Sequence, residues 1–226
     1  SVVNQGTLRG GYVILTAPQV SNEGLIAAPL GRIVLGAGDE VLLELDDRGL
    51  VNLQLEGGLG QIVNQGTLRA GSVQFDSTGS TVLAEGSNTV ARDIDIRGED
   101  VNVAGRVSGH TVLVGGGLQG QGPGRNARTT VVSGTISADA LLDEDAGTII
   151  VWSEDRTDVT GTLRANATSG DGGFIETSSR RDLLVTGSVS ASSTHGEAGE
   201  WLIDPANITI INGAGSTNNI DVSLIN

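Results

Sequence analysis

Val3-Asn4-Gln5-Gly6-Thr7-Leu8-Arg9-Gly10-Gly11 returns later in the chain, almost unchanged, as Val63-Asn64-Gln65-Gly66-Thr67-Leu68-Arg69-Ala70-Gly71. Two nearly identical phrases in one chain indicate an internal duplication. Weaker copies of the phrase recur around Gly24, Gly105, Gly134, Gly161 and Gly187. If the two longest intervals each hold two turns, the repeating unit is roughly 18 to 29 residues, which suits one coil of a solenoid.

Short apolar runs within each unit predict strands. Tyr12-Val13-Ile14-Leu15 and Thr148-Ile149-Ile150-Val151 are bounded by turn-forming residues, whereas Val51-Asn52-Leu53-Gln54-Leu55 and Asp93-Ile94-Asp95-Ile96-Arg97 alternate strictly between two faces. No segment carries a sustained apolar stripe with a period of 3.6 residues. The chain is therefore expected to be all-β.

Coils of such strands become stable by stacking, because each strand then pairs with the strands above and below it. The sequence predicts a parallel β-helix, or β-solenoid, of roughly ten coils. Val63 and Leu113 are expected to point into the tube, and Asp93 and Asp95 to face water. Glycines are expected to supply positive φ angles at the corners.

Composition narrows the functional classes. The 226 residues include 35 glycines, five aromatic residues and no cysteine, so the core is expected to be thin and aliphatic, without disulfides. With 13 basic and 27 acidic residues, the net charge of −14 argues against nucleic acid or an anionic membrane as a partner. No apolar run is long enough for a membrane span, and the chain starts in mid-pattern, as a segment of a longer protein would.

Four phrases in one order resemble the filamentous-haemagglutinin type of two-partner-secretion exoprotein. These are the Val-Asn-Gln-Gly-Thr-Leu-Arg-Ala-Gly units, Gly31-Arg32-Ile33-Val34-Leu35-Gly36-Ala37-Gly38-Asp39, Gly172-Gly173-Phe174-Ile175-Glu176-Thr177-Ser178 and Trp201-Leu202-Ile203-Asp204-Pro205. The likeness covers nearly the whole chain.

The resemblance implies a right-handed β-helix in a large adhesin that is extracellular or held at the bacterial cell surface. An outer-membrane β-barrel transporter would be the export partner of the parent protein. Residues 1–60 would be coils from the late part of the secretion domain, and residues 61–226 would continue the same elongated domain. The family's Asn-Pro-Asn-Gly-like motif is absent, so this segment departs from the family where the transporter is addressed.

Three functions follow from these patterns. The first is an adhesin segment whose rigid β-helix mediates cell-surface or cell-cell adhesion through weak contacts with host-cell glycans or extracellular polysaccharide. The second is a biofilm-matrix module that binds exopolysaccharide. The third is a polysaccharide-degrading β-helix enzyme, for which Asp93 and Asp95 are the nearest candidates, with a polar outer face as the alternative interpretation.

No residue is assigned a catalytic, cofactor-binding or metal-binding role. Trp152 and Trp201 are the candidate carbohydrate-binding residues, because an exposed indole can stack on a sugar ring, with packing in the core or a cap as the alternative. Loop carboxylates at Asp143–Asp145 are the best place for a weak Ca²⁺ site, with solvated turn carboxylates as the alternative.

Other candidate residues have simpler explanations. His110 and His195 are expected to be exposed loop residues without a catalytic partner. The loop at residues 119–126 is long enough to project from the coil, either as a binding loop or as a plain connector. Asn166 and Asn207 each begin an Asn-x-Thr glycosylation pattern, which is short enough to arise by chance.

Overall fold

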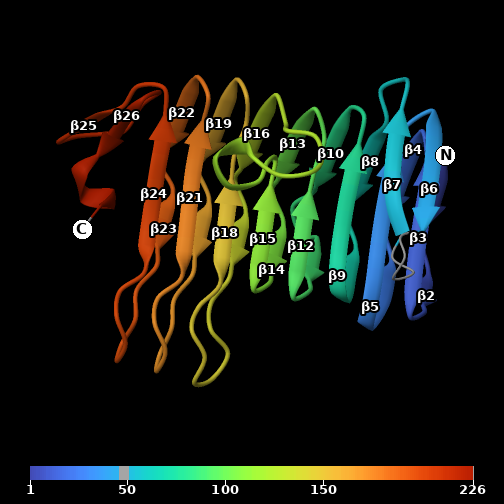
Figure 1. The fold of residues 1–226 in the computed structure, drawn as a ribbon, viewed down its shortest axis with the longest axis horizontal. Helices are drawn as coiled ribbons and strands as arrows, with labels where there is room; N and C mark the ends of the chain where they lie inside the picture. The colour runs from blue at the N-terminus through green and yellow to red at the C-terminus, as the bar shows by residue number, and fades with distance from the viewer. Residues whose placement is uncertain (46–50, 226) are drawn as a thin grey trace.

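A computed structural model describes residues 1–45 and 51–225 as one right-handed parallel β-helix (Figure 1). The strands stack along the long axis of the molecule, and the chain advances by one rung with each turn. Three parallel faces enclose the core, and each face holds one strand, or one half of a longer strand, from every rung. The predicted fold class is confirmed.

The first face consists of β1 (Val2–Asn4), β4 (Gln19–Asn22), β8 (Gln61–Asn64), β10 (Ser80–Leu83), β13 (Asp100–Val103), β16 (Thr129–Val132), β19 (Arg156–Val159) and β22 (Asp182–Val185). The second face consists of β2 (Thr7–Arg9), the first parts of β5 (Leu25–Ala37) and β9 (Thr67–Ser77), β11 (Asn88–Val90), β14 (Arg106–Ser108), β17 (Thr135–Ser137), β20 (Thr162–Arg164) and β23 (Ser188–Ser190).

The third face consists of β3 (Tyr12–Ala17), the second parts of β5 and β9, β12 (Asp93–Ile96), β15 (Thr111–Val114), β18 (Thr148–Val151), β21 (Phe174–Ser179) and β24 (Glu200–Pro205). Each face thus has eight layers in the described part of the chain. This number is close to the roughly ten coils expected from the repeat. The stacking continues across residue 60, because β4 pairs with β8 and β5 pairs with β9.

The core is a set of in-register columns of aliphatic side chains. One column on the third face runs through Ile94, Val112, Ile149 and Ile175, all of which are buried. Every rung supplies the same inward positions, so each apolar side chain packs on its counterparts one rung above and below. The thin aliphatic core expected from composition is what the structure contains.

An asparagine ladder replaces aliphatic residues at one inward corner of the first rungs. Asn4 Nδ2 donates to Asn22 Oδ1 at 2.8 Å, and Asn22 Nδ2 donates to Asn64 Oδ1 at 2.7 Å. The column continues as Leu83 and Val103. The duplicated Val-Asn-Gln-Gly phrase therefore carries buried amides that bond to one another across the rungs, while Asn4 and Asn22 also bond to the backbone of Gly6 and Gly24.

The repeated corner glycines are required by close approach of adjacent rungs rather than by positive φ. A Cβ at Gly66 would overlap the carbonyl oxygen of Gly24, and a Cβ at Gly134 would overlap that of Gly105. Neither Gly66 nor Gly134 has a positive φ. The expectation of positive φ is thus wrong at these corners, although a glycine is needed there for its missing side chain.

Two insertions leave the tube after third-face strands. A hairpin of β6 (Glu40–Leu45) and β7 (Val51–Glu56) is antiparallel and lies outside the coil. The alternation of Val51–Leu55 correctly predicted a strand, but this strand is not part of a rung. A second insertion, residues 116–126 with the 3-10 turn η1 (Leu118–Gly120), crosses the front of the third face (Figure 1).

The C-terminal segment covers part of the last rung. β25 (Thr209–Ile211) pairs with β26 (Asn219–Asp221), and η2 (Val222–Leu224) follows. The backbone N–H of Asn218 donates to the Leu183 carbonyl at 2.7 Å, and Ile220 is buried against the core. Among the described residues, no helix is long and apolar enough to cross a membrane.

In two strands, the side chains that face the core are not the predicted ones. Val63 aligns with Val82 on the outer side of the first face, while Ile62 and Asn64 are buried. Leu113 aligns with Asp95 on the outer side of the third face. Val63 and Leu113 were wrongly assigned to the interior, because both lie in runs that are apolar on both sides and carry no alternation.

Asp93 and Asp95 do lie on the outer face. The two isoleucines that alternate with them, Ile94 and Ile96, are buried in the core. Strict alternation in this strand therefore predicted its orientation correctly.

Adjacent valines in β16 provide a test of this orientation. Val132 is fully buried and Val131 is on the outer side. We expect Val132→Asn to lower the free energy of unfolding by about 2 to 4 kcal/mol, because it buries an amide without a partner. Val131→Asn should change it by less than about 0.5 kcal/mol. Urea unfolding followed by circular dichroism measures both, and equal effects would contradict the assignment of the two faces.

Candidate functional site

A groove runs along the outer side of the third face, between the hairpin and the second insertion. We call residues 116–126 the strap. Beneath the strap is a cavity of about 520 Å³, and a second cavity of about 650 Å³ extends from it toward the hairpin. Both cavities are lined by Asp95, Arg97, Leu113 and Pro123, so they form one continuous groove. Each of the two cavities has a volume in the range of small-molecule binding sites.

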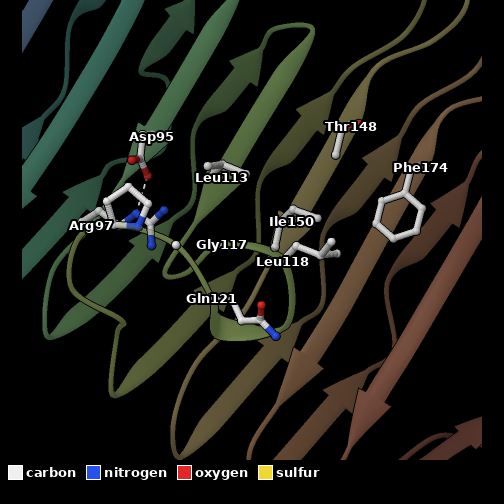
Figure 2. Close-up of a pocket in the computed structure, with 11 residues that line it drawn as sticks. Asp95, Arg97, Leu113, Gly117, Leu118, Gln121, Thr148, Ile150 and Phe174 are labelled. Atoms are coloured by element: carbon white, nitrogen blue, oxygen red, sulfur yellow. Dashed lines mark hydrogen bonds and ion pairs between the residues drawn. The ribbon is translucent and has the colours of Figure 1, made fainter.

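The floor of the groove changes from polar to apolar along the axis. Parallel register places Gln74, Asp95, Leu113 and Ile150 in one outward column of the floor, one residue per rung. Glu176 continues this column one rung further, where the strap buries it. Adjacent strands lie about 4.8 Å apart, so this change takes place over a few rungs. Figure 2 shows Leu113, Ile150 and Phe174 on successive strands, with Leu118 of the strap beside Ile150.

The side chains of the two halves differ in chemistry. The half near the hairpin is lined by Arg32, Gln54, Ser72, Gln74, Asp76, Asp93 and Thr111. The half under the strap is lined by Leu113, Leu118, Gln121, Pro123, Thr148, Ile150 and Phe174. The first half offers many hydrogen-bonding groups, and the second offers apolar contact.

Arginines fasten one end of the strap. Arg125 Nε lies 2.9 Å from Asp76 Oδ1, and Arg125 Nη2 donates to the Leu55 carbonyl of the hairpin at 3.4 Å. Arg97 forms an ion pair with Asp95 and donates from Nη1 to the Arg125 carbonyl at 3.3 Å. The strap is thus tied to the hairpin and to two rungs of the floor.

A buried carboxylate fastens the other end. The backbone N–H of Gln119 donates to both oxygens of Glu176, at 3.2 and 3.1 Å. Trp152 fills the space beneath this turn, and a Cβ at Gly120 would overlap its ring. Gly120 also has a φ of +70°, so both conformation and space require glycine there.

Burial shifts the acidity of the carboxylates around the groove. Burial raises the pKa of Asp95, although Arg97 opposes the shift. Burial also raises the pKa of Asp76 against the effect of Arg125, and it raises the pKa of Glu176. Of the three, Asp76 and Asp95 line the groove, whereas Glu176 is buried under the strap. Perturbed carboxylates within one cleft are typical of functional sites.

The two tryptophans pack against the protein. Trp152 is buried under the strap. Trp201 lies in the inward column of the last rung, packs against the core, and donates from Nε1 to Thr177 Oγ1 at 2.9 Å. Both rings have the packing role given as their alternative, and neither lines the groove.

Asp143–Asp145 lie in the first of three loops that project together from the last rungs (Figure 1). Asp145 Oδ1 accepts from the backbone N–H of Asp171 at 2.8 Å, and Asp171 Oδ1 accepts from that of Glu197 at 2.7 Å. These carboxylates bind backbone between rungs. No group of three metal-ligating side chains is found among residues 1–45 and 51–225.

The histidines and glycosylation motifs lie away from the groove. His110 is exposed, and His195 Nδ1 donates to the Thr168 carbonyl at 2.8 Å. Asn166 Oδ1 accepts from the backbone N–H of Ser192 at 2.9 Å, so its amide is engaged between rungs. Asn207 is exposed.

The loop at residues 119–126 folds back over the third face, whereas the sequence suggested that it projects. Asp76, Arg97, Arg125 and Glu176 were not recognised as site residues. Their only signal in the sequence is a charge within an otherwise apolar strand or a glycine-rich loop.

The fold and the groove define the class of the chain as a right-handed parallel β-helix with a groove on its outer face. The chain matches no protein-family model and no curated protein.

Glu176 provides a test of the strap's buried anchor. Its raised pKa means that the folded state binds the proton more tightly than the unfolded state, so stability falls as pH rises through the raised pKa. We expect Glu176→Gln to raise Tm at pH 7 by about 2 to 4 °C, since the amide oxygen can still accept from Gln119. The difference should disappear below about pH 4.

Glu200→Gln is the matched control, because Glu200 is exposed on the outer side of the next strand. Its Tm should follow that of the unchanged protein at both pH values. A destabilised Glu176→Gln protein at pH 7 would contradict the assignment of an unfavourable buried charge.

Proposed function

We propose that the chain is a segment of a secreted bacterial surface adhesin, whose β-helix is a rigid spine and whose third-face groove binds an extended glycan. The observation that carries the proposal is a continuous groove parallel to the spine, with polar and apolar subsites on successive rungs. The resemblance of the sequence phrases to filamentous-haemagglutinin-type exoproteins supports an extracellular location. Export of the parent protein through an outer-membrane β-barrel partner belongs to the same proposal.

The lining groups suit a sugar chain. Carboxylate, guanidinium and amide groups at Asp93, Arg32 and Gln74 can exchange hydrogen bonds with hydroxyls, which both donate and accept. Phe174 presents an apolar ring on which the C–H face of a sugar can pack. Successive rungs repeat at about 4.8 Å, a spacing similar to the length of one sugar unit in an extended chain.

The net charge of −14 favours a neutral glycan over an anionic one. Each contact with a sugar hydroxyl in an open groove is weak, because it replaces a contact with water. Adhesion would then depend on many such sites acting together, as expected when binding modules are repeated along a cell surface.

One observation favours a second candidate function, cleavage of the bound polysaccharide. Asp76 and Asp95 lie on adjacent rungs, and burial raises the pKa of each, as a general acid requires. We rank this function second because each carboxylate is engaged by an arginine. Release of new reducing ends that is lost in Asp95→Asn would favour it over simple binding.

Binding to a panel of bacterial exopolysaccharides and host glycans tests the proposal. We expect saturable binding to neutral glycans without release of reducing ends. Thr111→Trp places a bulky ring on the groove floor and should weaken binding by at least about tenfold. Asn102→Trp, on the outer side of the first face, is the control and should bind normally. Absence of binding to every glycan in the panel would overturn the proposal.

A further inference from the structure

The apolar half of the groove sets a requirement on its ligand. Leu113, Ile150 and Phe174 come from the strands of its floor, and Leu118 and Pro123 of the strap complete its apolar lining. A sugar whose only substituents are hydroxyls would place those hydroxyls against hydrocarbon, where they lose their hydrogen bonds to water. The cavity of about 520 Å³ therefore favours a sugar with an apolar substituent.

A donor and an acceptor stand together beside this apolar surface. Asp95 Oδ1 is paired with Arg97 Nε, and within the described part of the chain its second oxygen, Oδ2, accepts no hydrogen bond. Arg97 Nη1 donates to the Arg125 carbonyl, which leaves further guanidinium hydrogens on the groove side. Figure 2 shows this pair at the edge of the apolar floor.

This arrangement matches a secondary amide that carries a methyl group. The amide N–H can donate to Asp95 Oδ2, the amide carbonyl can accept from Arg97, and the methyl can pack on Leu113 and Ile150. A purely hydrocarbon ligand would bury the ion pair without satisfying it. An anionic sugar would meet the carboxylates of Asp93 and Asp95.

We propose that the groove is specific for glycans containing N-acetylated amino sugars, with one acetamido group held between Asp95, Arg97 and the apolar floor. This inference rests on the proposed glycan-binding function and names its ligand class.

Titration calorimetry compares two oligosaccharides of the same length and linkage. One is a β-1,4-linked N-acetylglucosamine oligomer, and the other is the corresponding glucose oligomer. We expect the N-acetylated chain to bind at least about tenfold more tightly, the effect of one charge-assisted hydrogen bond with its apolar contact. Equal affinities would overturn the inference and leave glycan binding intact. Absence of binding to both oligomers and to the whole glycan panel would overturn the proposed function itself.

Two variants locate the site. Asp95→Asn keeps the shape of the side chain, and Leu113→Ser removes the apolar floor residue next to Asp95. Each should reduce the preference for the N-acetylated chain to within about threefold, and thermal unfolding confirms that the protein is folded. Val131→Ser, a half-buried outward residue on the first face, is the control for Leu113→Ser and should retain the full preference. A preference that survives both groove variants would place the binding site elsewhere and overturn the inference.

Discussion

In-register stacking of parallel strands is the constraint on which the rest of this structure depends. Each rung completes the backbone hydrogen bonds of its neighbours, so every inward or outward position recurs at the same place one rung further along. The buried asparagines Asn4, Asn22 and Asn64 satisfy one another only because this register holds. The corner glycines obey the same constraint, because the carbonyl of the adjacent rung occupies the space of their missing side chain. Register also decides which side chains gather in the groove.

The sequence predicted the fold because the repeated phrase contains the residues that stacking requires. Duplication of Val-Asn-Gln-Gly-Thr-Leu was sufficient to predict a solenoid of strands. The alternation in Asp93–Arg97 was sufficient to predict which side chains of β12 face the core. The same reasoning failed for Val63 and Leu113. When a strand is apolar on both of its faces, the sequence pattern does not show which face points into the core. On the third face the outer side of such a run is covered as well. Ile150 is buried on the outer side of β18, and the strap lies above it.

The groove could be predicted only in part, because its chemistry comes from residues far apart in the sequence. Asp95 was placed on the outer face, but nothing near it in the chain reveals that Arg125 ties the strap to Asp76. Glu176 has no signal of its own, since a carboxylate within Phe174–Ser179 resembles any outward polar residue until the strap buries it. Trp152 and Trp201 were candidates because an exposed indole can stack on a sugar ring, yet both rings pack against the tube. Burial of a charge by a distant segment is a tertiary property, and one sequence does not display it.

The position of the groove follows from where a solenoid tolerates insertions. The hairpin leaves the tube after β5, and the strap leaves it after β15, both at the corner between the third and first faces. Extra residues at a corner leave the ladders intact, and the cost of closing a longer loop grows slowly with its length. Both insertions return over the third face, so they form the two sides of a groove whose floor is β9, β12 and β15. A repetitive tube, which by itself presents similar surfaces along its length, thereby acquires one distinct site without any change in its core.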